Sequence, residues 1–346
     1  MSNRFFKEAT GALASKVGGL VIRFGAGIIL ARMLSPAGRG AYAALQVYPM
    51  LTNSFAELGI RQATVRLLGT KAASDQDIIG NIATLWIITS LLGGGIILWI
   101  YHQLNNPLIT SLAVFLAAGL VPVGVASSYA RGVFLGKEQI RTFNRFIWGA
   151  EAAYFAMLAI AWSLGRVSVD AAMIALVLSH LVIAAFSIRA VSQITPIRLR
   201  FDPGILRAIL SLGVLYASTS FVLQCLYKIQ AILVERLAGN TELGYFALAA
   251  SLAEQLWQLP TTLGQVVFSR SANATDPALF SAKTAQLHRL VLPFAAIGGL
   301  VLGFALFPII PILYGKDFRH SANVAAIALI GIVAFCSFRI LMMDLA

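Results

Sequence analysis

Long apolar segments separated by short polar turns repeat along the whole sequence. Each has the roughly 20 apolar residues that a helix needs to cross a hydrocarbon core about 30 Å thick. Backbone groups in lipid must form their hydrogen bonds within the segment, and barrel strands are much shorter, so each segment is predicted to be a helix. The pattern predicts ten helices, roughly at residues 10–34, 41–68, 78–101, 108–130, 143–165, 170–193, 207–237, 243–269, 289–313 and 321–342.

Composition agrees with this pattern. Hydrophobic residues make up 59% of the 346 residues and charged residues 12%, with a mean hydropathy of +0.82, whereas a soluble chain is about half apolar and about a quarter charged. These values exclude a soluble globular protein and predict an all-α polytopic membrane protein. Cys225 and Cys336 lie in apolar segments and the four histidines are dispersed, so we expect no disulfide framework, metal site or cofactor.

The basic residues predict an orientation. Lys and Arg number 26 against 14 Asp and Glu. When those in the connections are assigned to alternate sides, 15 fall on one side of the membrane, including Arg131 after the fourth segment, and 6 on the other, while the remaining 5 lie within predicted spans. The positive-inside rule then places the N-terminus and, after ten crossings, the C-terminus in the cytoplasm. Because topology and anionic lipid account for the basic excess, nucleic acid is not an expected partner.

A linker divides the predicted helices into two groups. Residues 195–204 contain two prolines and two arginines, which is typical of a solvent-facing connection. We therefore expect an N-terminal lobe over residues 1–200 with six helices and a C-terminal lobe over residues 201–346 with four. Residues 29–45 also match residues 232–248 at a constant offset without a gap, which favours two lobes of like topology facing each other, as in many secondary transporters.

Four short motifs occur in a defined order. They are Leu30-Ala31-Arg32-Met33-Leu34-Ser35-Pro36 followed by Gly40-Ala41-Tyr42, then Gly132-Val133-Phe134-Leu135-Gly136-Lys137, Leu243-Gly244-Tyr245-Phe246-Ala247-Leu248-Ala249 and Tyr314-Gly315-Lys316-Asp317-Phe318. In their order and spacing, over nearly the whole chain, the sequence resembles the oligosaccharide (O-antigen, Wzx-type) flippase family of the multidrug/oligosaccharidyl-lipid/polysaccharide (MOP) exporter superfamily.

The resemblance implies a MATE-like, two-lobed bundle of six plus six helices around a V-shaped cavity that opens to each side of the membrane in turn. It implies a multi-pass protein of the bacterial cytoplasmic membrane that moves a polyprenyl-pyrophosphate-linked oligosaccharide for surface polysaccharide or lipopolysaccharide synthesis. Other polysaccharide assembly proteins are expected partners. Because only four helices follow the linker, we expect a C-terminally short member with an incomplete second lobe.

Ionisable residues within the predicted first two spans are the main candidates for a binding site, because each costs at least about 2.5 kcal/mol at mid-bilayer. Lys16 and Arg23 share a face of the first span, and Glu57 precedes Arg61 by one turn in the second. Lys16 and Arg61 lie at similar depth, so the basic residues suit a pyrophosphate. The alternative is that Lys16 reaches the interface and Arg61 pairs with Glu57.

The remaining candidates lie on later helices. Lys228 and Glu254 have matched depth on a predicted hairpin, which favours a structural ion pair; alternatively Lys228, with Gln224 one turn away, lines the cavity. Glu151, an isolated acid on the fifth helix, is a candidate for ion coupling, and Glu57 and Glu254 are further polar or ion-coupling candidates.

Three functions fit a chain of this kind. A flippase is favoured because the first helix carries Lys16 and Arg23, which suit an anionic cargo. A multidrug or cation exporter of the same superfamily needs an acid in the first lobe. A polysaccharide polymerase or glycosyltransferase usually carries a sizeable external loop or an acidic catalytic motif, whereas the predicted external turns are short. We therefore expect a transporter without catalytic residues.

Overall fold

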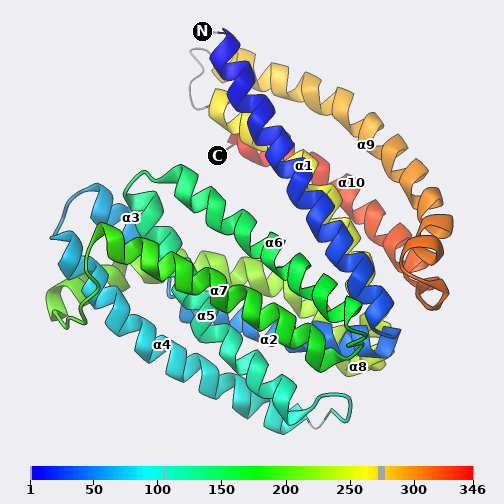
Figure 1. Cartoon of the computed structure of the whole chain (residues 1–346). Helices are drawn as coiled ribbons and strands as arrows, with labels where there is room; N and C mark the ends of the chain where they lie inside the picture. Colours follow the sequence, from blue (N-terminus) through cyan, green and yellow to red (C-terminus); the bar gives the residue numbers. More distant parts are fainter. Residues whose placement is uncertain (1, 105, 272–276, 346) are drawn as a thin grey trace. The chain divides into compact units, whose positions relative to one another are not determined.

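The structure is a computed structural model that describes the backbone of residues 2–104, 106–271 and 277–345. Side chains are described for residues 18–335 apart from residues 105, 215, 219–220, 255–284, 286–287, 290–291 and 294. Regular structure in these residues is helical throughout (Figure 1). The elements are α1 (Ser2–Met33), α2 (Pro36–Ala56), α3 (Ile60–Gly69), α4 (Asp75–Leu104), α5 (Ser111–Gly136), α6 (Ile140–Ser163), α7 (Val169–Ile194), α8 (Pro203–Ser271), α9 (Pro277–Leu313), the 3-10 turn η1 (Lys316–Phe318) and α10 (Ser321–Leu345).

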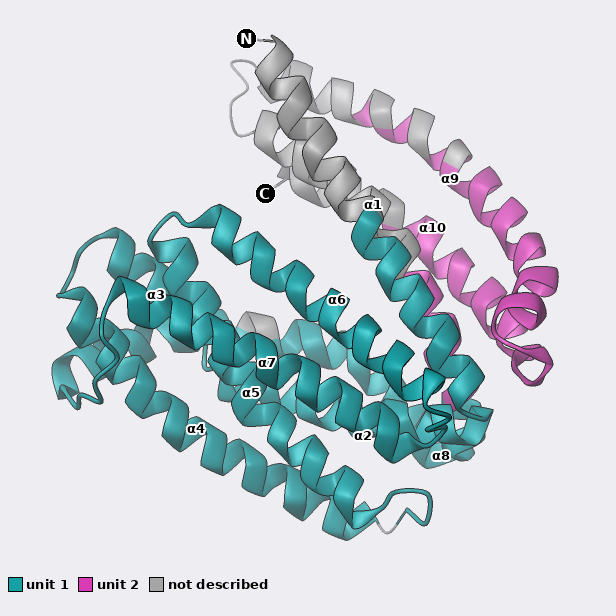
Figure 2. Cartoon of the chain, in the orientation of Figure 1, with its two compact units in different colours: residues 1–243 teal, residues 244–346 magenta. Residues whose placement is uncertain are grey.

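The chain forms two compact units, residues 1–243 and 244–346 (Figure 2). The first contains α1 to α7 and the first part of α8, and the second contains the rest of α8 with α9 and α10. The boundary between the two compact units therefore lies after residue 243, later in the chain than the predicted lobe boundary at residue 200. The two lobes expected from the linker stay a prediction.

Five helices in the described part are long and apolar enough to span a membrane, or six if the two segments of α8 that meet at a bend, Pro203–Ser218 and Phe221–Glu254, count as one span. The five are α4, α5, α6, α7 and residues 295–313 of α9. The fold is thus that of an all-α polytopic membrane protein, and the count of ten crossings stays a prediction.

Polar residues at the turns explain where several helices begin. The hydroxyl oxygens of Thr110 and Ser168 accept hydrogen bonds from the backbone N–H of Ala113 and Ala171, each at 3.1 Å. Ser35 caps α2 in the same way, and Pro36 follows it at a first-turn position that needs no N–H donor. These caps satisfy backbone donors that a helix start leaves unpaired.

The second predicted segment, residues 41–68, is not one helix. It is broken between α2 and α3, where Leu58 and Gly59 have positive φ angles of 47° and 63°. A Cβ on Gly59 would lie 2.0 Å from the carbonyl oxygen of Gly213 in α8, and one on Gly213 would lie 2.2 Å from that of Leu58. The two backbones meet here because both glycines lack a side chain. Apolar periodicity alone does not reveal such a contact.

Residues 203–271 form one helix except at Gly239, where φ is 84° and ψ is −178°. This conformation is accessible essentially only to glycine. The break separates the seventh and eighth predicted segments and lies at the residue that the repeat offset aligns with Pro36, the start of α2.

Helix α5 is the centre of the first unit, because it contacts α2, α3, α4, α6 and α7. Pro122 lies inside this helix, and its carbonyl accepts a hydrogen bond of 2.8 Å from the indole of Trp86 in α4. In the second unit α9 packs against α10, and Tyr245 meets the rings of Phe318 and His320 edge-on.

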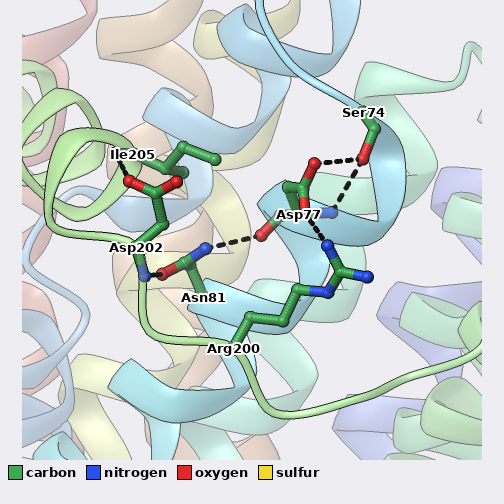
Figure 3. Close-up of polar contacts among 6 residues, drawn as sticks. All are labelled: Ser74, Asp77, Asn81, Arg200, Asp202 and Ile205. Carbon is green, nitrogen blue, oxygen red and sulfur yellow. Dashed lines mark hydrogen bonds and ion pairs between the residues drawn. The ribbon is translucent and has the colours of Figure 1, made fainter.

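The connection between α7 and α8 is bound to the start of α4 rather than free in solvent. The Arg200 N–H donates to the Gly80 carbonyl at 3.3 Å, and the Thr84 hydroxyl donates to the Arg200 carbonyl at 2.7 Å. The Arg200 guanidinium also forms an ion pair with Asp77 (Figure 3). A Cβ on Gly80 would lie 2.4 Å from the Arg198 carbonyl oxygen, so glycine permits this close approach.

Buried Asn81 completes this attachment. Its side-chain oxygen accepts from the Asp202 N–H and its amide donates to the Asp77 carbonyl, both at 2.8 Å (Figure 3). The Asp202 carboxylate accepts from the N–H groups of Gly204 and Ile205 and so caps α8. The connection therefore fixes the start of α8 on the first unit.

Candidate functional site

The first charged pair inside the bundle joins α1 to α6. Arg23 Nε donates to Glu151 Oε1 at 3.0 Å, and the two side chains are 39% and 32% exposed. On either side of the pair, glycines of α1 receive aromatic rings of α6: Gly18 faces Trp148 and Gly25 faces Phe155. The glycines of α1 thus permit close packing against α6. Glu151, expected to be an isolated acid, is instead paired.

The second pair lies at the break between α2 and α3. Arg61 Nε donates to Glu57 Oε1 at 2.8 Å, and the Gln62 side-chain oxygen accepts from Arg61 Nη2 at 3.1 Å. The pairing of Glu57 with Arg61 that the spacing allowed is therefore formed. The break places this pair against α5, where Tyr129 donates a long hydrogen bond of 3.4 Å to the Ala56 carbonyl.

A third arginine joins this pair from α5. Arg131 is half-buried and lies within electrostatic reach of both Arg61 and Glu57. The neighbouring Gly132 is so close to α3 that a Cβ there would lie 2.9 Å from the Arg61 carbonyl oxygen. Within the described residues, the Arg131 side chain forms no hydrogen bond or ion pair.

His180 in α7 connects the two pairs. It lies within electrostatic reach of both Glu151 and Arg131, and its Nδ1 is hydrogen-bonded to the Leu176 carbonyl at 2.9 Å. We call the whole set the polar network: Arg23, Glu57, Arg61, Arg131, Glu151 and His180. With His180 neutral, its three arginines and two glutamates leave one net positive charge.

Arg131 and His180 were not expected in a site. Arg131 was assigned to the connection after residue 130, where it contributed to the predicted orientation of the chain. In the structure α5 continues to Gly136, so Arg131 lies within this helix. His180 was set aside because no other histidine lies at a metal-ligand spacing. The signal available in the sequence was the apolar stretch Val133-Phe134-Leu135, which continues beyond Arg131 before the polar residues Lys137 and Glu138.

The other expected site residues are not brought into this network by the described contacts. Lys16 lies outside the residues whose side chains are described. Gln224 and Lys228 are half-buried in the part of α8 that belongs to the first unit, and Glu254 is exposed in the second. An ion pair between Lys228 and Glu254 therefore stays a prediction. Among the described residues, no three His, Cys, Asp or Glu side chains are grouped to hold a metal ion.

Solved structures with the same fold are membrane transporters. A multidrug resistance MATE family transporter of the MOP superfamily, in an inward-facing conformation, has a TM-score of 0.62 and 14% identity, covering 94% of this chain and 82% of that one. The lipid II flippase MurJ, in an inward closed conformation, has a TM-score of 0.70 and 14% identity, covering 96% of this chain and 74% of that one. MATE in complex with MaL6 has a TM-score of 0.54 and 13% identity, covering 95% and 81%.

At these identities the likeness establishes the fold alone, which is that of MOP superfamily transporters. No curated protein matches the sequence closely enough to count as a relative. A family model does match, and it covers most of the chain. The model describes polysaccharide biosynthesis proteins and matches residues 29–323, so the chain belongs to the polysaccharide biosynthesis protein family.

Proposed function

We propose that this protein is a flippase that moves a polyprenyl-pyrophosphate-linked oligosaccharide across the bacterial cytoplasmic membrane. The observation that carries the proposal is the polar network, in which cations outnumber anions inside a bundle of transporter fold. Charged groups are costly at membrane depth and are retained there for a function. A pyrophosphate is the part of such a cargo that needs positive charge, because arginine binds phosphate oxygens through charge-assisted hydrogen bonds.

The same network argues against the export of cations. A cation carrier needs a carboxylate that is open to its cargo, and in this structure Glu57 and Glu151 each accept from an arginine. A lipid-linked cargo also has a route that a soluble substrate lacks, because its polyprenyl tail stays in the bilayer while only the head group crosses. The protein acts by alternating access of its lobes, with both termini in the cytoplasm, and carries out no covalent chemistry.

Complementation tests the proposal. The chain is produced in bacteria that lack their own oligosaccharide flippase, and surface polysaccharide is measured. We expect export to be restored by the chain and lost in Arg23→Ala and Lys16→Ala at equal membrane level. Arg141→Ala, which removes an exposed arginine outside the polar network, is the matched control and is expected to export normally.

The alternatives give other results in the same cells. A drug exporter would raise resistance to cationic dyes without restoring glycan, and a polymerase would change glycan length rather than its presence at the surface. Full export by both Arg23→Ala and Lys16→Ala would contradict the role of the intramembrane cations.

A further inference from the structure

We infer that Arg131 and Arg61 together bind the pyrophosphate of the cargo, and that Glu57 occupies the Arg61 guanidinium until the cargo replaces it. The inference rests on the proposed function and assigns two roles within it. It makes Arg131 a binding residue and Glu57 a competitor of the ligand. Three features of the first unit support it.

The first feature is the position of the two arginines. Helices α3 and α5 touch backbone to backbone, because Gly132 has no side chain to keep them apart: a Cβ there would lie 2.9 Å from the Arg61 carbonyl oxygen and 3.2 Å from its Cα. Arg131 directly precedes Gly132 in α5. The side chains of Arg61 and Arg131 therefore originate from neighbouring points on two helices, at a separation at which their charges interact.

The second feature is the charge balance at this point. Two guanidinium groups face one carboxylate, and Glu57 accepts its hydrogen bond from Arg61, at 2.8 Å. Arg131 feels the repulsion of Arg61, and among the described side chains none donates to or accepts from it. Glu57 attracts Arg131 but forms its hydrogen bond with Arg61, and a half-buried cation without a hydrogen-bonded counter-ion is unfavourable. A pyrophosphate removes the imbalance, because its two phosphate groups can each accept from one guanidinium.

The third feature is the break in the helix. Leu58 has a φ of 47°, which is strained for a residue with a branched side chain, and Gly59 has a φ of 63°. The break makes Glu57 the C-cap of α2 and places Arg61 in the first turn of α3. Interrupted helices of this kind line substrate sites in transporters, and the start of α3 adds a favourable dipole for an anion. The strain is thus located at the proposed binding residues.

Binding to the purified protein in lipid nanodiscs separates this inference from a structural role for the arginines. The probes are undecaprenyl pyrophosphate and undecaprenyl monophosphate. We expect Arg131→Gln to weaken pyrophosphate binding by about tenfold or more and monophosphate binding by less. The reason is that Arg131 is proposed to bind the second phosphate group, which the monophosphate lacks. Arg131→Lys keeps the charge without the planar fork and is expected to lie between wild type and Arg131→Gln. Arg141→Gln, the control of equal charge, is expected to change binding less than about twofold.

Glu57→Gln gives a result in the opposite direction. Removing the competing carboxylate is expected to tighten pyrophosphate binding several-fold, whereas a merely structural Glu57 would weaken it when substituted. Wild-type affinity in Arg131→Gln, or weaker binding in a folded Glu57→Gln protein, would overturn the inference and leave the proposed function standing. A wild-type protein that binds neither probe would overturn both.

Discussion

The side-chain amides of Asn106 and Asn240 form two reciprocal hydrogen bonds of 3.1 Å, each amide donating to the carbonyl oxygen of the other. Asn106 lies in the connection between α4 and α5, and Asn240 directly follows the break of α8 at Gly239. One turn earlier on α8, Glu235 accepts a hydrogen bond of 3.0 Å from the Tyr48 hydroxyl of α2. The break in α8 is therefore attached to the first unit at two points.

Loss of one amide leaves the other without its partner, so Asn240→Ala is expected to lower the free energy of unfolding by about 1–2 kcal/mol. The double variant Asn106→Ala/Asn240→Ala should lose less than the sum of the single variants, because it leaves no unpaired amide. Thermal unfolding in detergent measures both effects. Gln103→Ala, at an exposed residue of α4, is the control, and strictly additive losses would speak against the pairing.

The Arg23–Glu151 pair has a structural and a functional component that two variants separate. Arg23→Gln leaves Glu151 unpaired inside the bundle and is expected to cost about 1–2 kcal/mol, less than the roughly 3–5 of a fully buried pair, because the side chains are 39% and 32% exposed. Arg23→Gln/Glu151→Gln should recover stability, since both charges are gone, but not glycan export. Recovery of export together with stability would make the pair purely structural.

Gly59 is expected to be the least replaceable glycine of the first unit. Gly59→Ala would place a Cβ 2.0 Å from the Gly213 carbonyl oxygen at a φ of +63°, so we expect a loss of at least about 3 kcal/mol and little monodisperse protein. Gly69→Ala is the matched control in the same helix region, where nothing lies within 4 Å of the added Cβ. Equal yields of the two variants by size-exclusion chromatography would contradict the backbone contact.

The attachment of the α7–α8 connection to α4 depends on Asn81, which is fully buried and bonded to Asp202 and Asp77. Asn81→Ala is expected to cost about 1–3 kcal/mol and to expose the connection, because it leaves backbone groups unpaired. Limited trypsin digestion should then cut faster after Arg198 and Arg200. Asn144→Ala, on an exposed part of α6, should leave the cleavage rate unchanged, and no acceleration in Asn81→Ala would mean that the connection is held by other contacts.

Local sequence was sufficient for features that depend on neighbours along the chain. The helices of the first unit follow the apolar segments to within a few residues at many of their ends, because burial in lipid requires continuous apolar helix. The Glu57–Arg61 pair follows from a spacing of one turn. The family resemblance rests on motifs that the sequence carries directly, and the matching family model confirms it.

One predicted helix boundary was wrong, and it assigned a residue of the polar network to a connection. Ending the fourth segment at residue 130 placed Arg131 in a connection, whereas α5 includes it and ends at Gly136. An arginine close to a predicted helix end is compatible with both positions, because its long side chain can reach the interface from inside a span. The packing of Gly132 on α3 decides between them.

The sequence by itself determined that this chain is a bundle of membrane helices of the polysaccharide biosynthesis family, because hydrophobicity and short motifs are local properties. Only the tertiary structure decided which charges meet. Arg23 pairs with Glu151, 128 residues away, and the break between α2 and α3 requires glycine at residue 59 because the backbone of Gly213 in α8 occupies the space that a side chain would need. Such contacts depend on how helices distant in sequence pack, and apolar periodicity carries no information about their partners.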